Sequence, residues 1–176
     1  MRDSSVVVEA PINLRRFNHV LLTVGLVLSA VLALVLSRGG EALPTEAEQL
    51  GQRHLDVTRA AAAQVQAFLG IDHQNVDERA QVVLDGGTGD FKQQYADELD
   101  SLARSAQAQR STAEATVLEV GMNDIDASTA TVFVAADTEV TSKVTDGKAR
   151  TVPWRIQLDM VKEGERWLTS GLQFVG

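Results

Sequence analysis

The spacing of hydrophobic positions changes three times along the chain, and each spacing is typical of a different kind of element. The first pattern is the run at 20–37, VLLTVGLVLSAVLALVLS, which holds no charge and no proline and has Leu or Val at 12 of its 18 positions. As a helix it spans roughly 27 Å, about one hydrocarbon core. A core helix of a soluble domain would show a polar face, and this run has none. The run therefore predicts a transmembrane helix.

A cleaved signal peptide is the alternative interpretation of this run. Its hydrophobic core would be about 7–15 residues long, with a small-x-small cleavage site behind it. The run is longer and continues directly into Arg38-Gly39-Gly40-Glu41, so a retained anchor is favoured. Three arginines precede the run within residues 1–19, whereas Arg38 alone follows it closely. This bias predicts a cytoplasmic tail over 1–19 and an extracytoplasmic chain after the anchor.

From residue 45 the apolar positions recur at steps of three and four, which indicates amphipathic helices. Glycine and proline residues mark 38–44 as a linker before them. Thr45 and Glu48 match a capping box, and Gly70 is a suitable stop for the helix between them. The stripe of this first helix consists of Leu50, His54, Val57, Ala61, Val65 and Phe68.

Two further helical patterns follow. Asn75 and Glu78 offer a cap for a short helix that ends at Gly86-Gly87. Asp90 is then expected to cap a third helix. The apolar positions are Val76, Ala80, Val83 and Leu84 in the second helix, and Phe91, Tyr95, Leu99, Leu102 and Ala106 in the third.

From Ser111 to the end of the chain the hydrophobic period is two, which predicts strands. Turns expected at 123–124, 146–147 and 163–164 separate four strands. The residues expected to alternate towards one face are Thr116, Leu118 and Val120; Ala130, Val132, Val134, Ala136, Thr138 and Val140; Val152, Trp154, Ile156, Leu158 and Met160; and Leu168, Ser170, Leu172 and Phe174. Three helices followed by four meandering strands predict an α+β domain over 45–176, with helices on one face of an antiparallel sheet.

Charge and composition restrict the partners of this domain. Residues 39–176 hold 12 of the 16 basic and 22 of the 24 acidic residues, which gives a net charge of −10. Such a surface repels nucleic acid and anionic lipid headgroups. The chain has no cysteine, so disulfides, thiolate chemistry and thiolate metal sites are excluded, and the core alone must hold the domain together.

Candidate chemistry is sparse. His19 lies at the membrane edge, and His54 lies on the apolar stripe of the first helix, where a packed, hydrogen-bonded histidine is expected. Asp72 and His73 are adjacent in a loop and form at most half of an acid–base pair. No nucleophile-elbow, zinc-protease or P-loop motif occurs. No catalytic, cofactor-binding or metal-ligating residue is therefore expected.

Two other features of the sequence have alternative interpretations. The stretch 86–90, GGTGD, opens a helix, and its N–H groups are candidates for holding an anion. Asp85 and Asp90 flank it with negative charge, which favours a tight turn capped by Asp90. Trp154 is expected in the core, whereas Trp167 falls on the opposite face from its neighbour Leu168. There it would cover the outside of the sheet or meet a partner.

Several short motifs in the second half of the chain are similar to those of a known family. These are Thr88-Gly89-Asp90-Phe91 with Tyr95, the strands at 132–134 and 158–162, and the closing GERWL at 164–168. In this order behind an N-terminal anchor, they resemble the Mce-associated membrane proteins of actinobacteria, over the chain from about residue 15 to its end. The family commonly places a glycine just before Arg-Trp, where this chain has Glu165.

This resemblance implies a fold like nuclear transport factor 2, a cone of three helices packed on a curved four-stranded sheet. It implies a non-catalytic accessory or scaffold subunit of an Mce lipid-import complex in the cell envelope, single-pass in the plasma membrane, with Mce subunits or a permease as partners. One alternative is an extracytoplasmic module that binds a lipid or sterol in the cone. Another is an enzyme of the ketosteroid-isomerase kind, which is disfavoured because Glu119, Asp137 and Asp159 alternate away from the inward positions.

Overall fold

The computed structural model describes residues 26–27, 29–31, 33–34 and 45–175. The chain divides into two compact units, Met1–Pro44 and Thr45–Gly176. In the first unit the described residues are helical, and their leucine and valine side chains are exposed. Among the described residues, no helix is both long and apolar enough to cross a membrane. The expected tail and linker lie outside the described residues, as does much of the anchor expected over 20–37.

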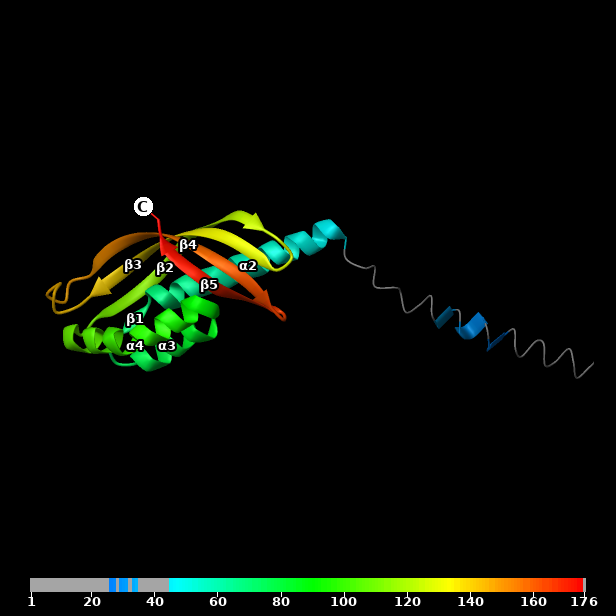
Figure 1. The fold of residues 1–176 in the computed structure, drawn as a ribbon. Helices are drawn as coiled ribbons and strands as arrows, with labels where there is room; N and C mark the ends of the chain where they lie inside the picture. Colours follow the sequence, from blue (N-terminus) through cyan, green and yellow to red (C-terminus); the bar gives the residue numbers. More distant parts are fainter. Residues whose placement is uncertain (1–25, 28, 32, 35–44, 176) are drawn as a thin grey trace, which may run out of the picture. The chain divides into compact units, whose positions relative to one another are not determined.

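The second unit is an α+β domain, as the periodicity predicts. Its elements are helices α2 (Glu46–Leu69), α3 (Val76–Asp85) and α4 (Gly89–Gln109), and strands β1 (Ile71–Asp72), β2 (Thr112–Ile125), β3 (Thr129–Thr141), β4 (Arg150–Glu163) and β5 (Arg166–Phe174). The strands form one antiparallel sheet in the order β1-β2-β3-β4-β5. Figure 1 shows the three helices on one side of a curved sheet.

The sheet has five strands where four were expected. The additional strand is β1, which pairs Ile71 with Ala113 and Asp72 with Thr112. A strand of two residues is too short to display an alternating pattern, so periodicity could not reveal it. It extends the sheet directly after α2 and returns the chain towards α3.

Helix α2 begins and ends where the sequence predicts. The Thr45 side chain accepts a hydrogen bond from the Glu48 N–H, and Glu48 in turn accepts one from the Thr45 N–H at 2.7 Å. The Thr45 N–H and then its hydroxyl hold the pKa of Glu48 below its ordinary value. At the other end, the Gly70 N–H donates to the carbonyl of Gln66 and ends the helix.

The core lies between α2 and the inner face of the sheet. On α2, Val57, Ala61 and Val65 are completely buried. The sheet contributes Ala130, Val132, Val134, Ala136, Ile156, Leu158, Met160 and Trp167 to the same cluster. Each fully buried aliphatic side chain contributes about 1.5–3 kcal/mol relative to exposure. The predicted stripe of α2 is thus confirmed in its middle, whereas Leu50, in the first turns of the helix, is exposed.

The predicted faces of β3 and β4 are confirmed, whereas that of β2 is wrong at Thr116 and Leu118 and correct at Val120. Along β2 the register shifts between Val117 and Glu119 and again between Met122 and Asp124. Each shift is a β-bulge, and one inserted residue reverses the alternation that follows. The residues facing inward are therefore Ala113, Ala115 and Val117 before the first bulge, and Val120, Met122 and Ile125 after it. The strand continues through 123–124, where a turn was expected.

The expectation that Trp167 lies on the outer face is wrong, because β5 contains a third bulge. Opposite the step from Asp159 to Met160, the partner in β5 moves from Gly171 to Thr169, so Ser170 is the inserted residue. Trp167 and Thr169 consequently face inward, and Trp167 belongs to the buried core with 6% exposure. Trp154, expected in the core, packs against it half-buried.

Leu158 provides a direct test of this register. It is completely buried in the middle of β4, so Leu158→Ala in the isolated domain, residues 45–176, should reduce the free energy of unfolding by about 2–5 kcal/mol. The neighbouring Gln157 points to the outer face, and Gln157→Ala should cost under about 1 kcal/mol. Both values follow from urea unfolding. Equal losses for the two variants would mean that the register of β4 is wrong by one residue.

Candidate functional site

The residues singled out by sequence lie apart from one another. His54 is half-buried on α2, and its Nδ1 lies 3.0 Å from the carbonyl oxygen of Leu50, so it is hydrogen-bonded as expected but lies outside the core cluster. The His73 Nδ1 lies 3.7 Å from an Asp72 carboxylate oxygen that already accepts from the Gln74 N–H. His19 lies outside the described residues. Among the described residues, no group of three or more His, Asp or Glu side chains could hold a metal ion.

The glycine-rich loop 86–90 is a structural junction. The Gly86 carbonyl accepts from the Thr169 N–H at 2.9 Å, and the Thr88 N–H donates to the Thr169 carbonyl at 2.8 Å. These bonds fasten the loop to the free edge of β5. The Thr88 hydroxyl donates to Glu163 at 2.6 Å. The expected cap is wrong by two residues: Thr88 is the N-cap of α4, and Asp90 lies in the first turn, where its charge still favours the helix dipole.

Close packing explains the first glycine of this loop. A Cβ on Gly86 would lie 1.9 Å from the side-chain oxygen of Gln64. Gln64 is buried with 4% exposure, and its amide nitrogen donates to the Val83 carbonyl at 3.1 Å. This bond ties α2 to α3, and a side chain at position 86 would displace it.

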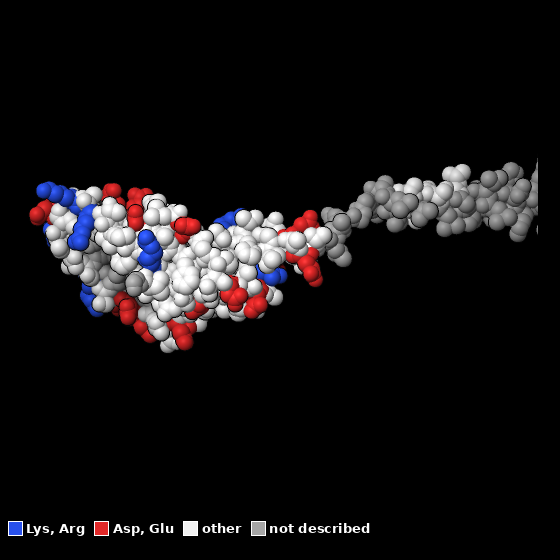
Figure 2. Space-filling view, turned by 90° about the horizontal axis from the view of Figure 1, so that it is seen from above, with Lys and Arg blue, Asp and Glu red and all other residues white. Residues whose placement is uncertain are grey.

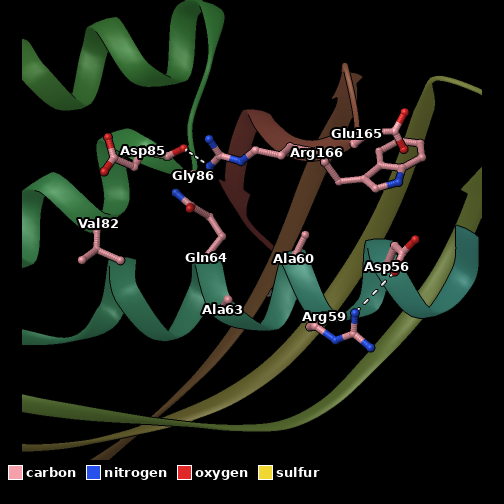
Figure 3. A pocket seen from close by; sticks show the side chains of 11 residues that line it. Asp56, Arg59, Ala60, Ala63, Gln64, Val82, Asp85, Gly86, Glu165 and Arg166 are labelled. Carbon is pink, nitrogen blue, oxygen red and sulfur yellow. Dashed lines mark hydrogen bonds and ion pairs between the residues drawn. The ribbon is translucent and has the colours of Figure 1, made fainter.

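Figure 3 shows the groove in front of this junction, where α2, the end of α3 and the β4–β5 turn meet. Its volume is about 500 Å³. The charged groups along it already have partners: Arg166 donates to the Asp85 carbonyl at 2.6 Å, and Arg59 lies 3.4 Å from Asp56. Both arginines are exposed. The groove therefore offers a polar contact surface and no nucleophile–base pair.

A second cavity, of about 300 Å³, lies between the helices. Its lining is Phe68, Leu69, Gly70, Ile71, Val76, Arg79, Tyr95, Glu98 and Leu102. The Tyr95 ring contacts Phe68 and Phe91, with centroids 5.9 and 6.3 Å away. Burial raises the pKa of the Tyr95 hydroxyl. Of the predicted α4 face, Phe91 and Ala106 are buried, Tyr95 is half-buried, and Leu102 is 36% exposed.

The outer face of the sheet carries a third hollow, of about 480 Å³. Its lining is Glu119, Gly121, Phe133, Val134, Ala135, Arg155, Ile156 and Val175. Phe133 is 41% exposed, and Leu118, the inserted residue of the first β2 bulge, is 58% exposed. Alternation along β3 places Phe133 on the face opposite Val132 and Val134, but it does not show that this face lacks a cover. No helix of the described residues covers it in Figure 1.

The sequence matches a family and one curated relative. The model of a family described as "Uncharacterized protein Rv1363c/MT1408-like" matches residues 19–176. The protein Rv1363c of Mycobacterium tuberculosis is 24% identical over 130 residues, which make up 74% of this chain and 49% of that protein. The chain thus spans about half the length of this relative.

Several solved structures superpose on this domain. An IcmL-like type IV secretion system protein from Legionella pneumophila superposes with a TM-score of 0.57 at 12% identity, covering 68% of this chain and 89% of that one. CagV, a VirB8 homolog from Helicobacter pylori, gives 0.56 at 11%, covering 69% and 97%. VirB8 of Agrobacterium tumefaciens gives 0.56 at 11%, covering 70% and 92%. At these identities the likeness shows the fold alone, which resembles that of VirB8 and of nuclear transport factor 2-like domains.

The junction between Gln64 and Gly86 can be tested by stability. Gly86→Ala should lower the free energy of unfolding by about 1–3 kcal/mol, because Gln64 must move and leave the Val83 carbonyl unsatisfied. Gly51→Ala is the matched control. A Cβ there meets nothing within 4 Å, and the helix should gain about 0.5–1 kcal/mol. A neutral Gly86→Ala in thermal melts would show that the junction tolerates a side chain.

Tyr95 is the single tyrosine of the chain, so its ionisation can be followed by ultraviolet absorbance. The folded pKa is raised, so the folded state holds the phenol proton more tightly than the unfolded state does. The stabilisation from Tyr95 is therefore complete below the unfolded pKa of about 10 and is lost as pH rises through the folded pKa. Tyr95→Phe should remove this part of the alkaline loss of stability. A midpoint at or below 10 in the folded domain would contradict the burial of this hydroxyl.

Proposed function

The chain belongs to the Rv1363c/MT1408-like family. From this membership and from the geometry of its domain, we propose that it is a non-catalytic, membrane-anchored scaffold subunit of an Mce-type lipid-import complex. In this proposal residues 20–37 anchor the chain, residues 1–19 are cytoplasmic, and the domain of residues 45–176 stands outside the plasma membrane. Mce subunits or a permease are the partners it contacts.

The observation that carries the proposal is the one-sided covering of the sheet. The inner face is filled by α2 and the core, whereas the outer face carries exposed Phe133 and Leu118. Exposed apolar residues of this size on one face are typical of a contact surface. The residues with possible chemistry, His54, His73 and Tyr95, lie in separate places on the helical side.

Two further observations support the membrane-bound role. The described residues of the N-terminal unit are helical with exposed apolar side chains such as Leu26, which suits a helix that meets lipid. The IcmL-like protein and CagV, which share this fold, belong to type IV secretion systems, and we infer a comparable use of the fold as a membrane-attached contact domain. The assignment to lipid import rests on the resemblance of the sequence to Mce-associated proteins.

A lipid- or sterol-binding module is the second candidate function. The interhelical cavity favours it, because apolar side chains surround a phenol and a guanidinium there, and its volume of about 300 Å³ is at the lower end for ligand sites. A lipid that co-purifies stoichiometrically with the domain would favour this module over the scaffold.

Membrane attachment provides the test of the scaffold. Confinement of two proteins to one bilayer raises their effective concentration, so a soluble fragment of residues 45–176 should fold but restore lipid uptake poorly in a deletion strain. The full chain should restore it. Equal complementation by exported fragment and full chain, at equal abundance, would contradict an anchored scaffold.

The same uptake assay separates contact from chemistry. Alanine at Asp72, His73, Asp90 or Tyr95, one at a time, should leave uptake intact once it is normalised to protein level. The normalisation matters because Tyr95 contributes packing and Asp90 a favourable helix-dipole charge. Loss of uptake at normal abundance in any of these variants would count against the scaffold.

A further inference from the structure

The outer face of the sheet has a regular arrangement around Phe133. The register aligns Gly121 of β2, Phe133 of β3 and Gln157 of β4 in one row across three strands. The next row consists of Glu119, Ala135 and Arg155. The smallest side chains of the two rows, Gly121 and Ala135, lie beside Phe133 and leave the hollow of about 480 Å³. Phe133 therefore lines the hollow and keeps 41% of its surface exposed.

The fold does not require the glycine that keeps this hollow open. Gly121 is absent from the glycines with positive φ, so its backbone suits any residue. A Cβ there would meet only the Phe133 carbonyl oxygen, at an ordinary 3.9 Å. Glycine in a strand lowers its stability, and a β-branched residue would pack against the exposed ring. Gly121 therefore keeps apolar surface of the outer face exposed, at a cost to the stability of the sheet.

Acidic side chains without partners lie along β2 and β3: Glu119 lines the hollow, whereas Asp137 and the pair Glu114 and Glu139 lie further along the two strands. Glu114 lies directly opposite Glu139 across β2 and β3, and like charges in that position destabilise a sheet. The residues Glu114, Glu119, Asp137 and Glu139 are on this face, and within the described residues none makes an ion pair or a side-chain hydrogen bond. Arg155 is two strands from Glu119, roughly 10 Å at the spacing of adjacent strands, too far for an ion pair.

Figure 2 looks onto this side of the domain and shows broad uncharged surface with acidic groups along its margin. Basic groups gather at one end of the view, and others lie within the uncharged surface and beyond it. Lys143 and Lys148 lie in the β3–β4 connection and Arg150 is the first residue of β4, all three beyond the lining of the hollow. The hollow therefore has an apolar centre with Glu119 on its β2 side and Arg155 on its β4 side, and further carboxylates follow along β2 and β3.

We propose that this hollow docks a protein segment that places an apolar side chain against Phe133 and Lys or Arg side chains against Glu114, Glu119, Asp137 and Glu139. The proposal rests on the scaffold function and names the surface and the chemistry of its partner. An aromatic ring beside a small pocket is typical of the centre of an interface, and the carboxylates supply steering and register.

The same charges disfavour two other occupants. A second copy seated face to face about an axis along β3 would set Asp137 and Glu139 against their own counterparts. Anionic lipid headgroups would meet the same carboxylates. A basic protein segment relieves the repulsion between Glu114 and Glu139, because it supplies a countercharge to carboxylates that make no ion pair within the described residues.

The test is photo-crosslinking in cells with the full-length chain. A photoreactive residue replaces Gln157, next to Phe133 in the register but outside the lining of the hollow. We expect one dominant protein adduct whose cross-linked peptide, identified by mass spectrometry, holds an apolar residue flanked by Lys or Arg. An adduct with a second copy, an adduct with lipid, or no adduct would overturn the proposal.

Filling the hollow gives the decisive variant. Gly121→Val should reduce the adduct at least tenfold while the protein accumulates normally and its melting temperature is unchanged or raised. Gln173→Val is the matched control, since Gln173 is exposed on the same outer face but does not line the hollow. An adduct that persists in Gly121→Val would overturn the proposal.

Charge removal tests the carboxylates along β2 and β3 separately. The double variant Glu114→Gln with Glu139→Gln should reduce the adduct severalfold, whereas Asp97→Asn with Asp100→Asn, which removes the same charge from the exposed face of α4, should not. Equal effects would overturn the electrostatic part of the proposal. Lipid uptake in Gly121→Val separates this proposal from the scaffold function: loss of the adduct with normal uptake would uphold the docking surface and contradict the role in import.

Discussion

Burial of the inner sheet face against α2 is the interaction on which the rest of the domain depends. The chain has no cysteine, so no disulfide supplements this core. Three fully buried positions of α2, Val57, Ala61 and Val65, meet the inward side chains of β3 and β4. Since these two strands form the centre of the sheet, their contact with α2 determines which face of the sheet the helices leave exposed. The outer face can serve as a contact surface because the inner face is already occupied.

The other two helices are positioned by fewer contacts, and these are specific. The buried Gln64 of α2 binds the last turn of α3, and Gly86 leaves room for it. The loop that follows is fastened to β5 through Thr88 and Thr169, so the start of α4 is fixed to the sheet edge. The far part of α4 buries little beyond Ala106. This uneven packing leaves the interhelical cavity beside Tyr95 and accounts for the exposure of Leu102.

Bulges decide which side chains reach the core and which reach the surface. One inserted residue in β2 turns Leu118 outward, and one in β5 turns Trp167 inward. Inserted residues of this kind also twist and bend the strands, which fits the curved sheet in Figure 1. The face with Phe133 is therefore a product of the register as a whole, and the proposed docking surface depends on the same pairing that builds the core.

The sequence by itself determined the elements that local rules govern. The capping box at Thr45 and Glu48, the stop at Gly70, the apolar stripe of α2 and the alternation of β3 and β4 follow from side-chain period and hydrogen-bonding chemistry within a few residues, and all are found in the structure. Tertiary structure decided what depends on partners distant in the chain. The bulges at Leu118 and Ser170, the two-residue strand at Ile71 and the cap at Thr88 each result from pairing or packing with a distant segment. A period read along one strand contains no information about its neighbour, so it could place Phe133 opposite the core but could not show that no helix among the described residues covers it.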